Sequence, residues 1–213
     1  MPKRIALTFD DGPNTVTTPK VLDVLEEHGI VASFFLIADS ITPESAEQTR
    51  RAFAMGCDIE NHSRTHGFMN QMTAEQIREE VRYCTDKIVE ITGKAPKFFR
   101  PPFIAMNQTM YDNIDLTFIC GAGCEDWVPD VSAEERAERV LRNAEDGQIV
   151  LLHDLPGNDN TVEALKTIIP ELKKRGFEFV TISQIFERSG ITPVRNRLYS
   201  SVYQTTDEPH NPS

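Results

Sequence analysis

The chain has 213 residues, of which 39% are hydrophobic and 26% charged, a composition that suits one ordinary globular domain with a full core. Its formal net charge of −11 argues against nucleic acid as a partner, because phosphate contacts need a surplus of Lys and Arg, and disfavours an anionic membrane surface. No apolar run approaches the roughly 18 residues of a membrane span. A neutral substrate or a bound cation suits this charge better. We also expect a monomer.

The first residues, Met1-Pro2-Lys3-Arg4, lead at once into an apolar run and leave no room for a signal peptide. We expect a secreted protein whose export signal has been removed, or a cytoplasmic protein if Met1 is the native start. The cysteines contain no C-x-x-C pair and are too sparse for a disulfide scaffold. Their roles are left open: Cys57, Cys84, Cys120 and Cys124.

Short apolar segments alternate with amphipathic ones along the chain. The predicted strands cover 5–9, 31–37, 57–60, 97–100, 116–120, 148–152 and 177–180. The predicted helices cover 18–28, 43–55, 73–92, 133–144, 162–172 and 183–188. This alternation predicts parallel βα units, and about seven strands suit a distorted or incomplete (β/α) barrel, with a doubly wound open sheet as the alternative. We predict a single domain over 1–213, with a core over about 4–189 and a polar C-terminal extension over 190–213.

Two adjacent carboxylates, Asp10 and Asp11, follow the first apolar run, and Gly12-Pro13 then turns the chain. Two like charges at a strand end repel each other unless a cation or a proton lies between them. The pair therefore predicts a cation site at the rim of the sheet.

Two histidines with a spacing of four residues, His62 and His66, follow the third predicted strand. In a turn or short helix they would share one face and could chelate one divalent ion. The alternative is a pair of surface histidines. Combined with the aspartates, one Asp and two His would leave coordination positions open, which is typical of a catalytic site, and the other Asp could act as a base.

Three further residues follow predicted strands, where ligands gather in parallel α/β folds. Arg100 lies between Phe99 and two prolines and could pair with a site carboxylate, or be a surface Arg. His153 ends a buried strand as a candidate general acid, or a structural histidine. Asp126 could orient it, and Trp127 could face a sugar, form a pocket wall or pack in the core.

Five segments together resemble the polysaccharide deacetylase family, also called carbohydrate esterase family 4. They are Thr8-Phe-Asp-Asp-Gly-Pro13, His62-Ser-Arg-Thr-His66, Arg100-Pro-Pro-Phe103, Asp126-Trp127 and Leu151-Leu-His-Asp154, in the family's order and spacing. The resemblance implies a distorted (β/α) barrel and metal-dependent hydrolysis of acetyl groups from carbohydrate.

The resemblance also implies a role for each matched residue. The catalytic residues would be Asp10 as base, Arg100 holding that base, His153 as general acid and Asp126 tuning the acid. The ligands of one divalent ion, Zn²⁺ or Co²⁺, would be Asp11, His62 and His66. The substrate contacts would be Trp127 and Leu151 as walls of an acetate pocket, and the N–H of Phe103 after Pro102 in an oxyanion hole.

The chain departs from the common family pattern at Gly123, where an Asp is usual, and at Phe103-Ile104-Ala105, where Tyr and Gly are usual. In several runs it is most similar to the bacterial acetylxylan esterase branch. We therefore expect a deacetylase that prefers O-acetyl groups on xylan. The alternatives are an N-deacetylase of chitin oligomers or peptidoglycan and a non-catalytic carbohydrate-binding relative, while the net charge disfavours a phosphate-ester hydrolase.

Overall fold

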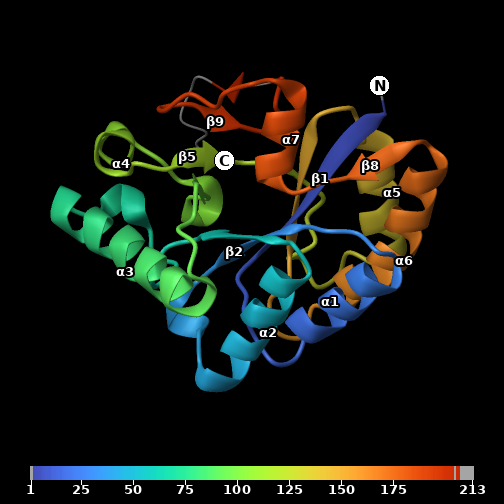
Figure 1. Ribbon diagram of the computed structural model, residues 1–213, viewed down its shortest axis with the longest axis horizontal. Coiled ribbons are helices and arrows are strands. Elements are labelled where there is room, and N and C mark those ends of the chain that lie inside the picture. Colours follow the sequence, from blue (N-terminus) through green and yellow to red (C-terminus); the bar gives the residue numbers. More distant parts are fainter. Residues whose placement is uncertain (1, 204, 207–213) are drawn as a thin grey trace.

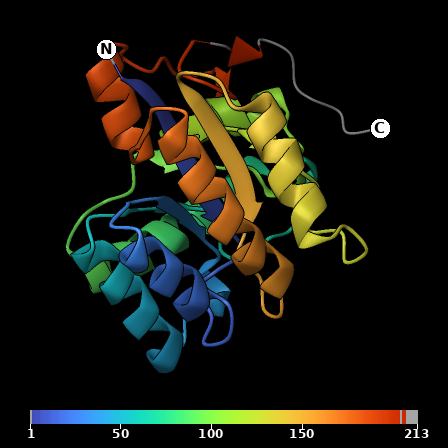
Figure 2. The ribbon, with the colours of Figure 1, turned by 90° about the vertical axis from the view of Figure 1, so that its right-hand side faces the viewer.

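The structure is a computed structural model that describes residues 2–203 and 205–206. A mostly parallel sheet curls into an incomplete barrel, and the helices cover its outer side (Figures 1 and 2). This confirms the predicted distorted (β/α) barrel. None of the helices in the described part of the chain is both long and apolar enough to cross a bilayer.

The strands form one sheet in the order β10-β9-β5-β4-β3-β2-β1-β7-β6, and β8 pairs with the first half of β1. Their bounds are β1 Lys3–Asp10, β2 Ser33–Leu36, β3 Asp58–Asn61, β4 Phe98–Phe99, β5 Thr117–Ile119, β6 Ala122–Gly123, β7 Gln148–His153, β8 Phe177–Phe179, β9 Leu198–Tyr199 and β10 Thr205–Thr206. Every pairing between these strands is parallel except that of β9 with β10.

The helices follow the strands as predicted, with one short addition. Their bounds are α1 Thr18–Glu27, α2 Pro43–Ala54, α3 Ala74–Thr92, α4 Gln108–Asn113, α5 Ala133–Asn143, α6 Asp159–Lys174 and α7 Ile182–Ser189. The predicted capping box of α3 is present, because Thr73 and Gln76 satisfy each other's backbone N–H groups. The short helix α4 was not predicted, since one turn and a half is too brief to show apolar periodicity.

Strand β1 lies in the interior of the sheet, between β2 and β7, and positions the functional end of the barrel. It pairs with β2 on one side and with β7 on the other, so that Asp10 is in register with Phe35 and with His153. The residues from Ile5 to Asp10 are all buried, as expected for a parallel strand covered on both faces. The register therefore places the end of β1 next to the end of β7.

The C-terminal extension contributes to the barrel, which its polar composition did not predict. Leu198 and Tyr199 pair with β5, and Leu198 is completely buried. Beyond them, the Ser200 carbonyl accepts the Ile149 N–H and the Val202 N–H donates to the Gly147 carbonyl. Residues 198–202 thus fill the space between β5 and β7 and connect the two edges of the curled sheet.

Substitution of Leu198 by Ala should cost about 2–5 kcal/mol of unfolding free energy, because it leaves a cavity in the core. Urea denaturation followed by circular dichroism measures this loss. Val194→Ala in the same extension is the matched control, since Val194 is 51% exposed and its removal should change stability by less than about 0.5 kcal/mol. Equal stability of the two variants would contradict the inclusion of the extension in the core.

Candidate active site

Asp10 and Arg100 form a buried ion pair at the end of the barrel. Arg100 Nη1 donates to Asp10 Oδ1 at 2.5 Å, and the guanidinium lies 4.2 Å from the centre of the Phe35 ring. Arg100 is fully buried, so it is not a surface arginine. Removing one partner of such a pair leaves an uncompensated charge and typically costs about 3–5 kcal/mol. The pair therefore fixes the carboxylate of Asp10 in one position.

Asp11, His62 and His66 converge beside this pair, with ligand atoms that all lie within 4.8 Å of one another. Asp11 Oδ1 is 3.5 Å from His62 Nε2 and 3.4 Å from His66 Nε2. This oxygen is buried and has no hydrogen-bond partner among the residues that the structure describes. A carboxylate oxygen and two imidazole nitrogens are the donors that Zn²⁺ and similar ions use, so the cluster fits one divalent cation.

The protonation states in this cluster favour metal binding. Burial alone would raise the pKa of Asp11, but contact with His62 and the charge of the nearby histidines lower it to about 2. Burial, followed by the charge of His62, lowers the pKa of His66. His62 Nδ1–H donates to the Arg100 carbonyl at 2.7 Å, so neutral His62 carries its free lone pair on Nε2.

The segment that carries both histidines is not the helical turn that their spacing suggested. It is an irregular loop in which Ser63 has φ 70° and His66 has φ 58°. Left-handed backbone at residues other than glycine costs about 1–3 kcal/mol each and persists only where neighbouring contacts impose it. The two histidines converge because of this loop conformation rather than because of helical periodicity.

A buried aspartate supports the turn after Asp11. Thr18 Oγ1 donates to the buried carboxyl of Asp154, whose backbone N–H donates to the Asp10 carbonyl at 3.1 Å. A Cβ on Gly12 would lie 2.5 Å from Asp154 Oδ2, which explains the glycine at this position. Burial raises the pKa of Asp154 to about 7.

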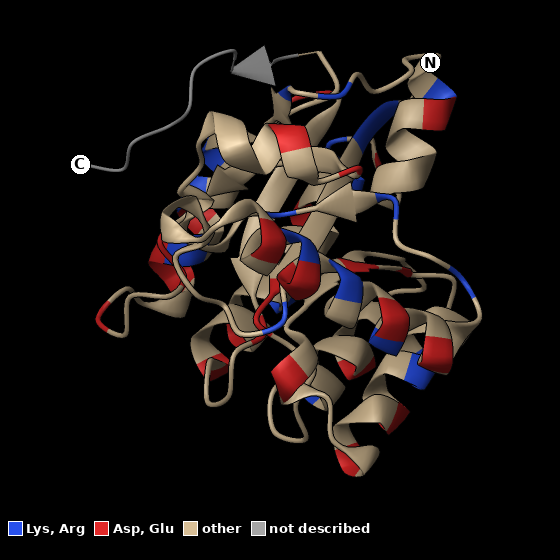
Figure 3. Cartoon of the chain, turned by 90° about the vertical axis from the view of Figure 1, so that its left-hand side faces the viewer, with Lys and Arg blue, Asp and Glu red and all other residues tan. Residues whose placement is uncertain are grey.

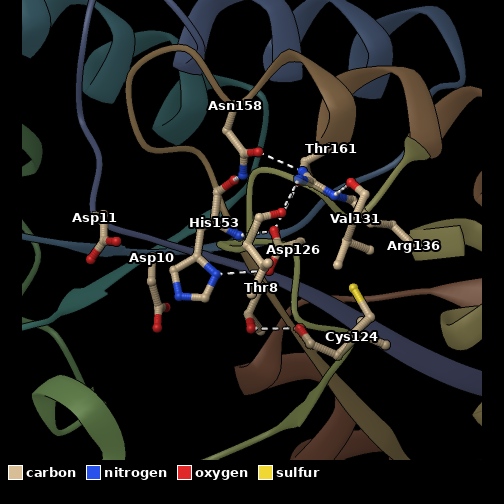
Figure 4. Close-up of polar contacts among 12 residues, drawn as sticks. Thr8, Asp10, Asp11, Cys124, Asp126, Val131, Arg136, His153, Asn158 and Thr161 are labelled. Carbon is tan, nitrogen blue, oxygen red and sulfur yellow. Dashed lines mark hydrogen bonds and ion pairs between the residues drawn. The ribbon is translucent and has the colours of Figure 1, made fainter.

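His153 lies between the aspartate pair and Asp126 (Figure 4). Its Nδ1 is 2.8 Å from Asp126 Oδ1, and its backbone N–H donates to Asp126 Oδ2 at 2.7 Å. Burial would lower the pKa of His153, but the Asp126 hydrogen bond and charge, helped by Asp10 and Asp11, raise it to about 9. The ring of Trp127 contacts the imidazole edge-on, with centroids 5.4 Å apart. A protonated His153 is available to donate a proton at Nε2.

Two residues that the sequence analysis missed hold Asp126 in place. Thr161 Oγ1 donates to Asp126 Oδ2 at 2.9 Å and accepts from Arg136 Nη1 at 2.9 Å (Figure 4). Arg136 is buried on α5 and also donates to Asn158 Oδ1 and to the Val131 carbonyl. Because Arg136 occupies an acceptor position of the Thr161 hydroxyl, the single hydroxyl hydrogen is directed to Asp126.

These groups open into one cavity of about 620 Å³. Its lining is Asp10, Asp11, His62, His66, Phe68, Pro101, Phe103, Ile104, Trp127, Leu151 and His153. Phe68, which sequence reasoning did not identify, is 50% exposed and stacks on Phe103 at 4.2 Å. Phe103 and Trp127 are about half exposed, whereas Phe99 is in the core. Pro102 is buried and precedes Phe103 without itself lining the cavity.

The polysaccharide deacetylase family model matches residues 1–118 of the chain, a stretch that carries both aspartates, both histidines and Arg100. The chain belongs to the polysaccharide deacetylase family. A bifunctional xylanase/deacetylase of Pseudobutyrivibrio xylanivorans is 47% identical over 201 residues, covering 94% of this chain and 33% of the relative. The chain thus spans only 33% of the length of that curated relative.

Two solved structures of similar proteins share the fold over nearly their whole length. The Xyl-CE4 domain of a multidomain xylanase from the hindgut metagenome of Trinervitermes trinervoides is 45% identical, with a TM-score of 0.93, covering 95% of this chain and 99% of that domain. A family 4 acetyl xylan esterase from Clostridium thermocellum, in complex with a cobalt ion, is 40% identical, with a TM-score of 0.91, covering 94% and 99%.

In this polysaccharide deacetylase family member, Gly123 lies beside the cavity where the common family pattern has an Asp. A Cβ on Gly123 would lie 3.5 Å from Leu151 Cδ2 and 3.5 Å from Trp127 Cζ3. The glycine therefore leaves the space next to these two side chains free of any further side chain.

Replacement of Asp126 by Asn should lower the pKa of His153 from about 9, because burial remains while the hydrogen bond to the carboxylate and its charge are lost. NMR titration of the imidazole in metal-free protein measures this. The exposed Asp130→Asn in the same loop is the control. An unchanged His153 titration in Asp126→Asn would contradict the assigned pair.

The raised pKa of His153 also predicts how the stability of the fold depends on pH. The pKa of folded His153 lies above its unfolded value of about 6.5, so the protonated ring stabilises the fold. This contribution is complete below about pH 6.5 and is lost as the pH rises through about 9. Denaturant unfolding between these pH values should show the loss in the wild type and a smaller loss in Asp126→Asn.

Proposed function

We propose that the chain is a metal-dependent carbohydrate deacetylase that hydrolyses acetyl groups, with O-acetyl groups on xylan as the preferred substrate. The observation that carries this proposal is the register of Asp10 with His153 across β1 and β7. It sets a candidate base and a candidate acid on neighbouring strands beside the Asp11–His62–His66 cluster, in one cavity. An acid and a base beside a candidate metal site are the requirements of acyl hydrolysis.

The divalent cation would be held by Asp11, His62 and His66, and Zn²⁺ or Co²⁺ suits this donor set. When bound, it would polarise the acetyl carbonyl and lower the pKa of a water molecule towards neutrality. The Oδ1 of Asp11 is buried and has no hydrogen-bond partner in the described part of the chain. This supports the assignment, because a buried carboxylate oxygen is otherwise costly to leave without a partner.

Asp10 is the group that accepts the proton of the attacking water, and Arg100 holds its carboxylate in position for that transfer. The water oxygen forms a bond to the acetyl carbon, and the negative charge that develops on the carbonyl oxygen would be stabilised by the Phe103 N–H. His153 then gives its Nε2 proton to the leaving sugar oxygen as the ester C–O bond breaks. Acetate and a free hydroxyl are the products.

The cavity offers surfaces that suit both parts of the substrate. Trp127 and Leu151 flank His153 and provide apolar walls for a methyl group. The exposed stack of Phe68 and Phe103 provides an aromatic face for a sugar ring. Acidic and basic residues are distributed over the outer helices (Figure 3). The formal net charge of −11 suits a neutral polysaccharide better than an anionic one.

The xylan preference draws support from the similar proteins, whose names include xylanase/deacetylase and acetyl xylan esterase. The alternative of an N-deacetylase uses the same base and acid, with an amine in place of the alcohol as leaving group. A non-catalytic carbohydrate-binding protein is disfavoured, because both candidate proton-transfer groups are in place and hydrogen-bonded to their partners.

Asp10→Asn should reduce turnover of acetylated xylan by roughly 100- to 10,000-fold, because the proton acceptor is lost. Released acetate is measured with metal-loaded protein on acetylated xylan and on N-acetylglucosamine oligomers. Asp112→Asn, an exposed aspartate on α4, is the control and should keep full activity. A chelator should abolish activity, and added Zn²⁺ or Co²⁺ should restore it.

Hydrolysis that survives both Asp10→Asn and chelation would overturn the mechanism. Acetate release from the N-acetyl oligomers alone would keep the mechanism but reverse the substrate assignment. Absence of release from either substrate, with the metal bound, would favour the non-catalytic alternative.

Phe68→Ala should raise KM for acetylated xylan about three- to ten-fold, as expected for the loss of one aromatic contact of about 0.5–1.5 kcal/mol. Turnover of a small alkyl acetate, which has no ring to stack, should remain unchanged. Val89→Ala removes another exposed apolar side chain, on α3, and serves as the matched control. An equal effect of Phe68→Ala on both substrates would argue against a sugar platform.

A further inference from the structure

The loop that carries His62 and His66 has an unusual set of backbone hydrogen bonds. Four consecutive N–H groups, those of residues 63–66, each donate to a side-chain oxygen. Ser63 N–H donates to Asn61 Oδ1 at 2.9 Å, and His66 N–H donates to Ser63 Oγ at 3.0 Å. The N–H groups of Arg64 and Thr65 both donate to Glu80 Oε2, at 3.0 and 2.8 Å. The shape of this loop is therefore set by side chains rather than by a regular backbone pattern.

Glu80 differs from the other two acceptors because it belongs to another element, α3. Asn61 is the last residue of β3 and Ser63 lies in the loop itself, whereas Glu80 reaches the loop from the buried face of the helix. The Thr65 hydroxyl also lies 3.1 Å from both carboxylate oxygens. A single carboxylate oxygen, Oε2, thus accepts two neighbouring backbone N–H groups, one with each lone pair. Glu80 therefore anchors the middle of the loop to a helix.

Further contacts connect the same loop to the same helix. Asn61 Nδ2 donates to the Val81 carbonyl at 2.8 Å, and the Arg64 guanidinium lies 4.1 Å from the centre of the Tyr83 ring. The loop bends through left-handed backbone at Ser63 and at His66. Such backbone needs outside support, and α3 supplies it between the two bends.

We propose that Glu80 is a positioning residue for the metal site. By binding the N–H groups of Arg64 and Thr65, it holds His62 and His66 at the separation from Asp11 that one divalent ion requires. Glu80 is not part of the ligand cluster, so its effect on the ion acts through the loop. This inference rests on the proposed metal-binding function.

Glu80→Ala should weaken metal binding about 10- to 100-fold, the usual cost of losing a group that orients metal ligands. Apoprotein is titrated with Zn²⁺ and Co²⁺ against a chromophoric chelator, and the visible absorption of bound Co²⁺ is recorded. We expect the Co²⁺ bands of this variant to shift or weaken, because the two imidazoles are no longer held in one arrangement.

Two further variants separate positioning from charge and from general stability. Glu80→Gln keeps a carbonyl oxygen that can accept both N–H groups, so its affinity should stay within about threefold of the wild type. Glu79→Ala removes the adjacent glutamate, which lies on the exposed face of α3 and pairs with Arg82, and should leave both affinity and spectrum unchanged. A purely structural role of Glu80 would lower the unfolding free energy without changing the Co²⁺ spectrum of the folded protein.

Native affinity and a native Co²⁺ spectrum in folded Glu80→Ala would overturn the proposal, as would an equal loss in Glu80→Gln or in Glu79→Ala. If Glu80→Ala does not fold, Glu80→Asp decides, because its shorter side chain cannot reach both N–H groups; weaker binding supports the proposal and native binding overturns it. If the wild-type protein binds neither ion, the proposed metal site itself is contradicted. That outcome is distinguishable from failure of the Glu80 role alone.

Discussion

The buried Arg100 connects the separate parts of the site. Its guanidinium binds the carboxylate of Asp10 on β1, while its backbone carbonyl accepts the Nδ1–H of His62 after β3. One residue therefore orients the candidate base and also selects the tautomer of a candidate metal ligand. A buried guanidinium without its carboxylate is costly, so this ion pair holds the end of β1 to the segment after β4, where the cavity opens. The geometry of the base and of the ligand set cannot change independently.

The two adjacent aspartates receive different partners from the same fold. Asp10 points to a permanent cation, whereas Asp11 points to two histidines that are suited to share a metal ion with it. Asp10 is the last residue of β1, whereas Asp11 lies beyond the strand with a φ of 74°. This left-handed backbone, followed by the turn at Gly12 that packs against Asp154, directs the two carboxylates differently. The like charges that seemed to conflict in the sequence are thus separated by the environment of each carboxylate.

The sequence was sufficient to predict the elements whose cause is local. Apolar strands, the capping box of α3 and polar side chains just after a strand each have a sequence pattern that spans only a few residues. Contacts between segments that are distant in the chain have no such local pattern. Glu80 is one of several charged residues on α3, Arg136 lies in a charged helix, and Phe68 lies in a connection, so their functions depend on what the fold places opposite them. The same reason explains why residues 198–202, short and flanked by polar sequence, were expected outside the core.

Because residues 198–202 close the barrel, they limit when the domain can complete its folding and where the chain can be divided. These residues hydrogen-bond to strands that begin far earlier in the chain, next to Ile119 and Ile149. The edges of the curled sheet therefore stay apart until almost the whole domain has left the ribosome, and contacts of such long sequence separation form slowly. For the same reason, a domain boundary drawn at the end of α7 would cut through the fold, and a fusion partner belongs beyond Thr206, the last residue of β10.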